Sequence, residues 1–133
     1  MPYLLDTDVI SATLRPRPDL GVIRRLASLA PDEAFTSAIN LGELVFGASR
    51  VDRPDLLERV LDIPSVIPVL PFDAPAAVRF GQLKAELERA GLPLAEPDLR
   101  IAATALANDL TLVTGDERHF ARVPGLSLEN CIA

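Results

Sequence analysis

Residues 3–8 read Tyr3-Leu4-Leu5-Asp6-Thr7-Asp8, a short apolar run that ends in acidic and hydroxyl side chains. An apolar run of this length with a polar boundary is typical of a buried strand. We expect the strand over Tyr3–Leu5 and a short helix over Val9–Leu14, which stops before Pro16. The chain therefore opens with a buried strand that has an acid at its carboxyl end.

The alternation of strand and helix continues along the chain. Apolar spacing and capping residues predict helices from Asp19 to Leu29, Ala38 to about Ser49, Arg53 to Asp62, Asp73 to about Ala90, and Asp98 to Asn108. Further strands are expected at Glu33–Ser37, Val66–Leu70, Leu110–Val113 and Leu126–Leu128, with a loop over 91–97. This order predicts an α/β fold with a central, mostly parallel sheet of about four to five strands and helices on both faces. We find no repeat or linker, so residues 1–133 are expected to form a single domain.

Composition narrows the class of protein. Of the 133 residues, 49% are hydrophobic, enough for a sizeable core. No apolar run approaches the roughly 20 residues needed to cross a bilayer, and the N-terminus lacks the basic start of a signal peptide. The one cysteine, Cys131, excludes an intrachain disulfide. We expect a soluble cytoplasmic protein without a membrane partner.

The net charge of −6 argues against nucleic-acid binding, because affinity for phosphates usually comes from cations. Bound divalent ions can invert the charge of an acidic centre. All but one of the thirteen basic residues are arginine, which suits phosphate contacts better than lysine, although a GC-rich genome explains the same bias.

Four acids fall where an α/β sheet places its functional sites. Asp6 and Asp116 follow predicted strands, and sites in open α/β sheets form outside the carboxyl ends of strands. Asp98 opens a predicted helix, and Glu43 lies in the first turns of another. We expect all four to converge on one sheet edge.

Each acid taken singly also has a structural interpretation. Asp6 and Asp98 can be N-caps, Asp116 can be a turn residue, and Glu43 can be an exposed helix acid. Glu43 is the hardest to explain structurally, because its neighbours are apolar and no basic residue lies within a helical turn. A carboxylate in such a setting needs a partner from elsewhere in the fold, and a metal ion is a good candidate.

Converging carboxylates predict a site for a divalent cation. Four negative charges repel one another unless protons or divalent cations settle among them. Mg²⁺ prefers oxygen ligands, and metal-bound water is a good nucleophile at phosphorus. Soft-metal sites are excluded by the single histidine and single cysteine.

Four blocks of sequence resemble one known family over essentially the whole chain. They are the stretches 3–11, 39–48, 98–103 and 112–120, each built around one of the four acids. In this order they resemble the PIN-domain ribonucleases, and within them the VapC toxins of bacterial toxin–antitoxin pairs. The resemblance implies a three-layer α/β/α fold of the PIN type and a metal-dependent endoribonuclease that acts as a toxin.

The resemblance also implies roles for individual residues. Asp6, Glu43, Asp98 and Asp116 become ligands of Mg²⁺ or Mn²⁺ or orient the hydrolytic water. Thr7 and Thr114 become supporting hydroxyls, with a helix cap and a strand-end hydroxyl as their structural alternatives. The implied partners are an RNA substrate, a VapB-like antitoxin and a second copy of the chain in a homodimer.

Several residues depart from the family pattern or remain open. We expect Asp8 to cap the first helix, Glu96 to be solvated, Cys131 to be a buried or half-buried packing residue, and His119 to have no catalytic role. Five arginines are candidates for contacts with phosphates, with plain surface charge as the alternative for each: Arg15, Arg17, Arg50, Arg118 and Arg122.

Two other functions are compatible with parts of the sequence. Asp6-Thr7-Asp8 after a strand resembles the opening motif of HAD-type phosphatases, but the only lysine, Lys84, falls within a predicted helix and is not linked to a strand. The other alternative is a non-catalytic PIN-like module that binds RNA or protein, which the intact set of four acids disfavours.

Overall fold

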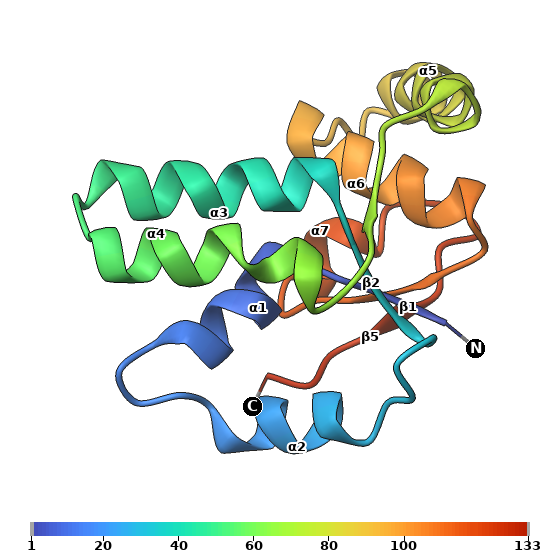
Figure 1. Ribbon diagram of the computed structural model, residues 1–133. Coiled ribbons are helices and arrows are strands. Elements are labelled where there is room, and N and C mark those ends of the chain that lie inside the picture. The colour runs from blue at the N-terminus through green and yellow to red at the C-terminus, as the bar shows by residue number, and fades with distance from the viewer. Residues whose placement is uncertain (1, 133) are drawn as a thin grey trace.

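A five-stranded parallel sheet forms the centre of the protein in a computed structural model that describes residues 2–132 (Figure 1). The strand order is β3-β2-β1-β4-β5, and every neighbouring pair is parallel. The strands are β1 (Tyr3–Leu5), β2 (Ala34–Ser37), β3 (Val69–Leu70), β4 (Thr111–Val113) and β5 (Leu128–Glu129). Because Leu5 pairs with Val113, Asp6 and Thr114 leave the sheet at the same level.

Helices cover both faces of this sheet. They are α1 (Thr7–Leu14), α2 (Leu20–Ala27), α3 (Ala38–Arg50), α4 (Pro54–Leu61), α5 (Ala74–Arg89), α6 (Glu96–Ala107) and α7 (Glu117–Phe120), with a 3-10 turn η1 at Ile63–Ser65. Successive strand residues point to opposite faces, so Leu4 and Leu5 enter different cores. The expected three-layer α/β/α arrangement with a mostly parallel sheet is confirmed.

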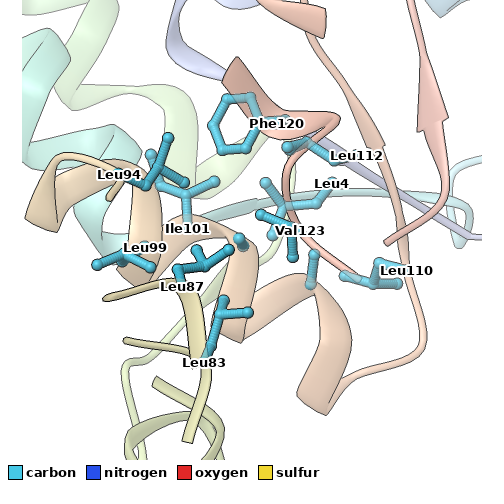
Figure 2. Close-up of a cluster of buried hydrophobic side chains, with 12 residues drawn as sticks. Leu4, Leu83, Leu87, Leu94, Leu99, Ile101, Leu110, Leu112, Phe120 and Val123 are labelled. Carbon is cyan, nitrogen blue, oxygen red and sulfur yellow. The ribbon is translucent and has the colours of Figure 1, made fainter. Parts of the chain in front are cut away.

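One core lies between the sheet and the α5–α6 pair (Figure 2). Leu4 and Leu112 from the strands meet Leu87 of α5 and Ile101 of α6 there. Helix α6 packs closely because it presents small side chains, including Ala102, which is fully buried. The second core joins the opposite sheet face to α1, α2, α3 and α4.

Some predicted boundaries are wrong. Helix α6 begins at Glu96 rather than Asp98, because Pro97 occupies the first turn, where proline's missing amide costs nothing. The predicted strand Val66–Leu70 shrinks to β3, because Val66 ends the 3-10 turn and is 74% exposed. The last strand is shifted to Leu128–Glu129 from the predicted Leu126–Leu128.

Two further features complete the fold. The short helix α7, which was not predicted, directly follows Asp116. Across residues 2–132, no helix combines the length and the apolar character that spanning a membrane requires.

Candidate active site

Asp6 lies at the carboxyl end of β1 and also begins α1. Its side chain is 7% exposed, and its Oδ1 accepts a hydrogen bond from the Thr7 amide at 2.8 Å. The N-cap interpretation of Asp6 is therefore correct, but the cap occupies only part of the carboxylate. A cap with spare oxygen lone pairs remains able to bind a cation.

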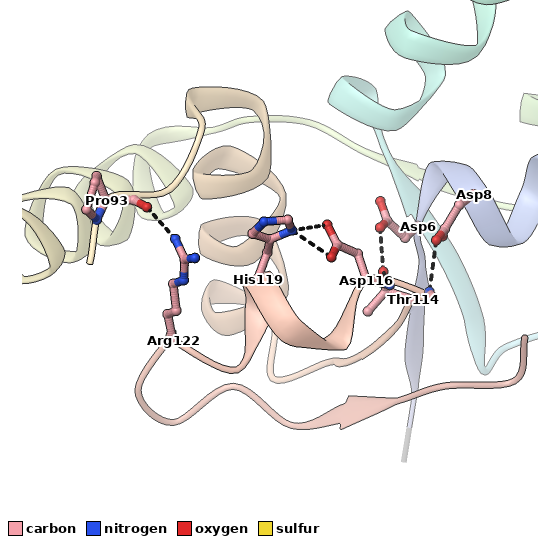
Figure 3. A network of polar contacts seen from close by, with 8 residues as sticks. Asp6, Asp8, Pro93, Thr114, Asp116, His119 and Arg122 are labelled. Carbon is pink, nitrogen blue, oxygen red and sulfur yellow. Dashed lines mark hydrogen bonds and ion pairs between the residues drawn. The ribbon is translucent and has the colours of Figure 1, made fainter. Parts of the chain in front are cut away.

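Two further donors fix the Asp6 carboxylate, and Figure 3 shows the first of them, the Thr114 hydroxyl. The Thr114 hydroxyl donates to Oδ2 at 2.7 Å, and the Asn40 side-chain amide donates to Oδ1 at 3.0 Å. Thr114 Oγ1 in turn accepts from the Asp116 amide at 3.0 Å. Thr114 thus links the first acid to the backbone of the fourth.

Thr7 links Asp6 to Glu43. The Thr7 hydroxyl donates to Glu43 Oε1 at 2.7 Å, and Thr7 Oγ1 accepts from the Asn40 side chain at 3.0 Å. The polar partner that Glu43 was expected to need is therefore the Thr7 hydroxyl. Both threonines lie within the site, rather than at its margin.

Asn40 is the site residue that the sequence analysis missed. Its side chain is fully buried, and its Oδ1 accepts a 2.5 Å hydrogen bond from Ser37, the N-cap of α3. Both amide hydrogens are used, one toward Asp6 and one toward Thr7. The available signal was its position three residues before Glu43, which places both on one helical face.

Asp98 is half-buried on α6 and feels the other acids. Burial is the main cause that raises the pKa of Asp98 to about 6, and the charges of Asp6, Glu43 and Asp116 raise it further. Burial also raises the pKa of Asp6, although its hydrogen-bond donors oppose the shift. The four predicted acids thus lie within electrostatic reach of one another.

Asp116 stands immediately before α7 and contacts His119. The His119 Nδ1 lies 2.7 and 2.8 Å from the two carboxylate oxygens (Figure 3). Both side chains are substantially exposed, at 49% for His119 and 40% for Asp116. The contact holds the exposed carboxylate beside the first turn of α7.

The expected role of Asp8 as the helix cap is wrong, because Asp6 takes that place. Asp8 Oδ2 instead accepts from the Gly115 amide at 2.9 Å, which ties α1 to the turn that carries Asp116. A β-carbon on Gly115 would lie 2.7 Å from Asp8 Oδ2, so a side chain there would force the Asp8 carboxylate or the turn to shift. Within residues 2–132, Asp8 Oδ1 is a buried oxygen without a hydrogen-bond partner.

Other residues singled out in the sequence lie outside this cluster. Glu96 is exposed and pairs with Lys84 at 2.7 Å and Arg100 at 3.1 Å. Cys131 is half-buried against the second core, as expected. Arg122 donates to the Pro93 carbonyl at 2.8 Å and so stabilises a loop (Figure 3).

The donor set fits a hard divalent cation. The four acids offer carboxylate oxygens. Burial first, and neighbouring negative charge second, raises the pKa values of Asp6, Asp8 and Asp98, and a bound cation would favour their charged forms. Within residues 2–132, no three His, Cys, Asp or Glu side chains stand close enough to form a ready-made cage.

Comparison with known proteins places the chain in one family. The PIN domain family model matches residues 3–126. Ribonuclease VapC2 of Rickettsia felis is 36% identical over 98% of both chains, and the tRNA(fMet)-specific endonuclease VapC of Shigella flexneri is 35% identical over 96% of both.

A solved structure supports the same family relationship. A crystal structure of VapBC2 from Rickettsia felis, bound to a promoter DNA fragment, contains a chain with a TM-score of 0.88 and 35% identity over 98% of both chains. The relatives' names do not favour the phosphatase alternative or the non-catalytic one. The chain belongs to the PIN-domain family and, within it, to the VapC-type proteins.

Proposed function

We propose that this protein is a metal-dependent endoribonuclease that acts as the toxin of a toxin–antitoxin pair. The observation that carries the proposal is the convergence of Asp6, Glu43, Asp98 and Asp116. Besides burial, the charges of the other three acids raise the pKa of Asp98, and hydrogen bonds join Thr114 to Asp6 and Thr7 to Glu43. The nuclease names of the full-length relatives support RNA as the substrate.

The four acids would hold Mg²⁺ or Mn²⁺ beside the scissile phosphate. When bound, the ion supplies a water of lowered pKa and stabilises the charge that develops on the phosphate oxygens. Asn40 and Thr114 keep the Asp6 carboxylate in one orientation, and Thr7 does the same for Glu43. The chain thus pre-orients its ligands, which lowers the cost of assembling the reactive geometry.

We further propose a VapB-like antitoxin as the protein partner. The support comes from similar chains that crystallised in complexes, such as VapBC from Salmonella typhimurium bound to DNA. We also propose that the chain forms a homodimer and that it acts in the cytoplasm, where its RNA substrate and antitoxin would be found.

The proposed activity is tested with purified chain and single-stranded RNA in Mg²⁺, in Mn²⁺ and in excess EDTA. We expect cleavage with either ion and none with EDTA. Asp116→Asn should abolish cleavage, because it removes one of the four proposed ligands. It should leave the fold intact, because the Asp116 side chain is 40% exposed and packs in neither core. Cleavage that survives both EDTA and Asp116→Asn would contradict the proposal.

A parallel assay addresses the phosphatase alternative. The same preparation is incubated with a generic phosphomonoester under the same conditions. We expect no turnover, whereas rapid turnover without RNA cleavage would favour a phosphatase.

A further inference from the structure

Two surface hollows meet at Glu43. One lies between α1, α3 and α4 and reaches Arg15 and Arg53, and the other runs along α3 toward the start of α6. The linings of the two hollows have four residues in common: Thr7, Ser11, Glu43 and Gly47. The two hollows therefore adjoin along these residues of α1 and α3, and together they are called here the α3 groove.

Basic side chains stand at both ends of the α3 groove, and the acid lies at its middle. Arg15 and Arg53 line the first end, and Arg50 and Arg100 line the second. Within residues 2–132, Arg15 and Arg50 form no ion pair with a carboxylate, so their charge is available to a ligand. This pattern suits a polyanion whose phosphates on each side of the acid need neutralisation.

An exposed aromatic ring marks the second end. Phe46 is 64% exposed, and the Arg50 guanidinium stacks over its ring at 5.5 Å. Nucleic acids without a paired strand stack their bases on such rings and on arginine planes. A duplex keeps its bases stacked inside, so it cannot use this ring.

Glycines keep the α3 groove open beside Glu43. A β-carbon added at Gly42 or Gly47 would meet no atom within 4 Å, so packing does not require glycine at either position. Glycine is a poor helix former, and both residues lie inside α3. Their presence is explained if the space above the helix is needed by a ligand.

We propose that the α3 groove is the path of a single strand of RNA, with phosphates near Arg15 and Arg50 and one base stacked on Phe46. This inference rests on the proposed nuclease function and adds the residues that would position the substrate on each side of Glu43. Glu43 lies between the two ends, so the scissile phosphate would pass over the middle of the path.

Substitution of Gly47 tests the path, because it fills the groove without disturbing the fold. With Mg²⁺ and single-stranded RNA, Gly47→Leu should raise KM at least tenfold, and Gly47→Ala should raise it less. The matched control is Gly81→Leu, because Gly81 is also a helical glycine with empty space around it but lies on α5, away from the groove. All three variants should melt no lower than the wild type, since leucine and alanine are better helix formers.

Binding without cleavage provides the second measurement. In an Asp116→Asn background, fluorescence anisotropy with a labelled single-stranded RNA should show weaker binding for Arg15→Ala and Arg50→Ala, with a shallower dependence on salt. Arg79→Ala is the matched control, because Arg79 is exposed on α5 and does not line the groove, and it should bind like its parent. An unlabelled duplex of the same sequence should compete poorly.

The outcomes separate the path from the nuclease function. If the wild type cleaves RNA and folded Gly47→Leu has an unchanged KM, the proposed RNA path along the α3 groove is wrong, but the proposed nuclease function stands. A change of sedimentation in Gly47→Leu with unchanged RNA binding would also overturn the path, because it would assign the groove to a second copy. Absence of wild-type cleavage would overturn the proposed function, and the anisotropy series would still test the path.

Discussion

At the scale of single residues, Asn40 shows how a neutral side chain can organise a charged site. Its two amide hydrogens point to Asp6 and Thr7, so the Thr7 hydroxyl is left to donate to Glu43. A buried hydrogen bond to a charged group contributes about 1.5–3 kcal/mol. The direction of every donor in this network therefore depends on an amide at position 40.

Asn40→Asp should show this dependence. The substitution keeps the size of the side chain but replaces both donors with a carboxylate beside Asp6. We expect the free energy of unfolding of the metal-free protein at pH 7.5 to fall by about 2 kcal/mol, and RNA cleavage to be lost. Urea denaturation measures the first effect.

Asn130→Asp is the matched control, because Asn130 is exposed and uses only its acceptor oxygen, toward the Ile132 amide. It should leave stability and cleavage nearly unchanged. Equal stability of Asn40→Asp and wild type would contradict the role of the amide.

The raised pKa of Asp98 predicts how the stability of the fold depends on pH. Its pKa rises from 3.8 to about 6 in the folded protein, so the folded state binds the proton more tightly than the unfolded state. The metal-free protein should therefore gain stability as pH falls from 7.5 to 5, and lose it as pH rises through 6. A shift of this size corresponds to nearly 3 kcal/mol, which solvent screening at a half-buried site reduces to about 1 kcal/mol.

Asp98→Asn should remove this contribution. Its melting temperature at pH 7.5 without metal should equal or exceed that of the wild type, and the difference should shrink at pH 5. A clear drop in melting temperature at pH 7.5 would instead identify Asp98 as a structural acid of α6.

The positions of the acids could be predicted from sequence, and their supporting residues could not. Asp6 and Asp116 follow apolar strands, a local pattern with one geometric meaning in a parallel sheet. Asn40 shares a helical face with Glu43, but a polar residue early in a helix is equally compatible with solvent and with burial. Only the packing of α3 against the start of α1 decides which one holds.

At the scale of elements, the turn between β4 and α7 depends on contact with α1. Asp8 Oδ2 accepts from the Gly115 amide, and the Ile132 side chain closes the other side of the glycine. The turn carries Asp116, so the first and last segments of the chain together position the fourth acid. A sequence pattern identifies the turn but not its tertiary support.

Gly115→Ala tests this support. The added methyl group would lie 2.7 Å from Asp8 Oδ2 and 2.8 Å from Ile132 Cδ1, so the two side chains or the turn must shift and the Asp8–Gly115 hydrogen bond is disturbed. We expect a loss of about 1–3 kcal/mol in stability, the usual cost of overpacking, together with reduced cleavage. Thermal unfolding and the RNA assay measure the two effects, and unchanged values for both would contradict the contact.

Element boundaries were predicted well where one local signal dominated. Strand β1 and the end of α5 agree with the apolar run and with Gly91, which adopts a φ of 70° after the helix. The start of α6 was misplaced because a proline both ends loops and opens helices. Strand β3 was overextended because β-branched Val66 fits a strand locally, while the 3-10 turn before it is set by tertiary packing.

At the scale of the whole molecule, the net charge of −6 is concentrated where a cation would relieve it. Any ligand that binds only the folded state stabilises it by mass action. Added Mg²⁺ at millimolar concentration should therefore raise the melting temperature of metal-free protein at pH 7.5. The variant Asp98→Asn should respond less, and an equal rise in both would indicate binding elsewhere.

The central claim is that the four acids act as one cation site, and calorimetric titration with Mn²⁺ tests it most directly. The series comprises the wild type, Asp6→Asn, Glu43→Gln, Asp98→Asn and Asp116→Asn, all metal-free and at pH 7.5. We predict binding to the wild type and an affinity at least tenfold weaker in every variant. An affinity in the variants equal to that of the wild type, or no binding to the wild type, would contradict the claim.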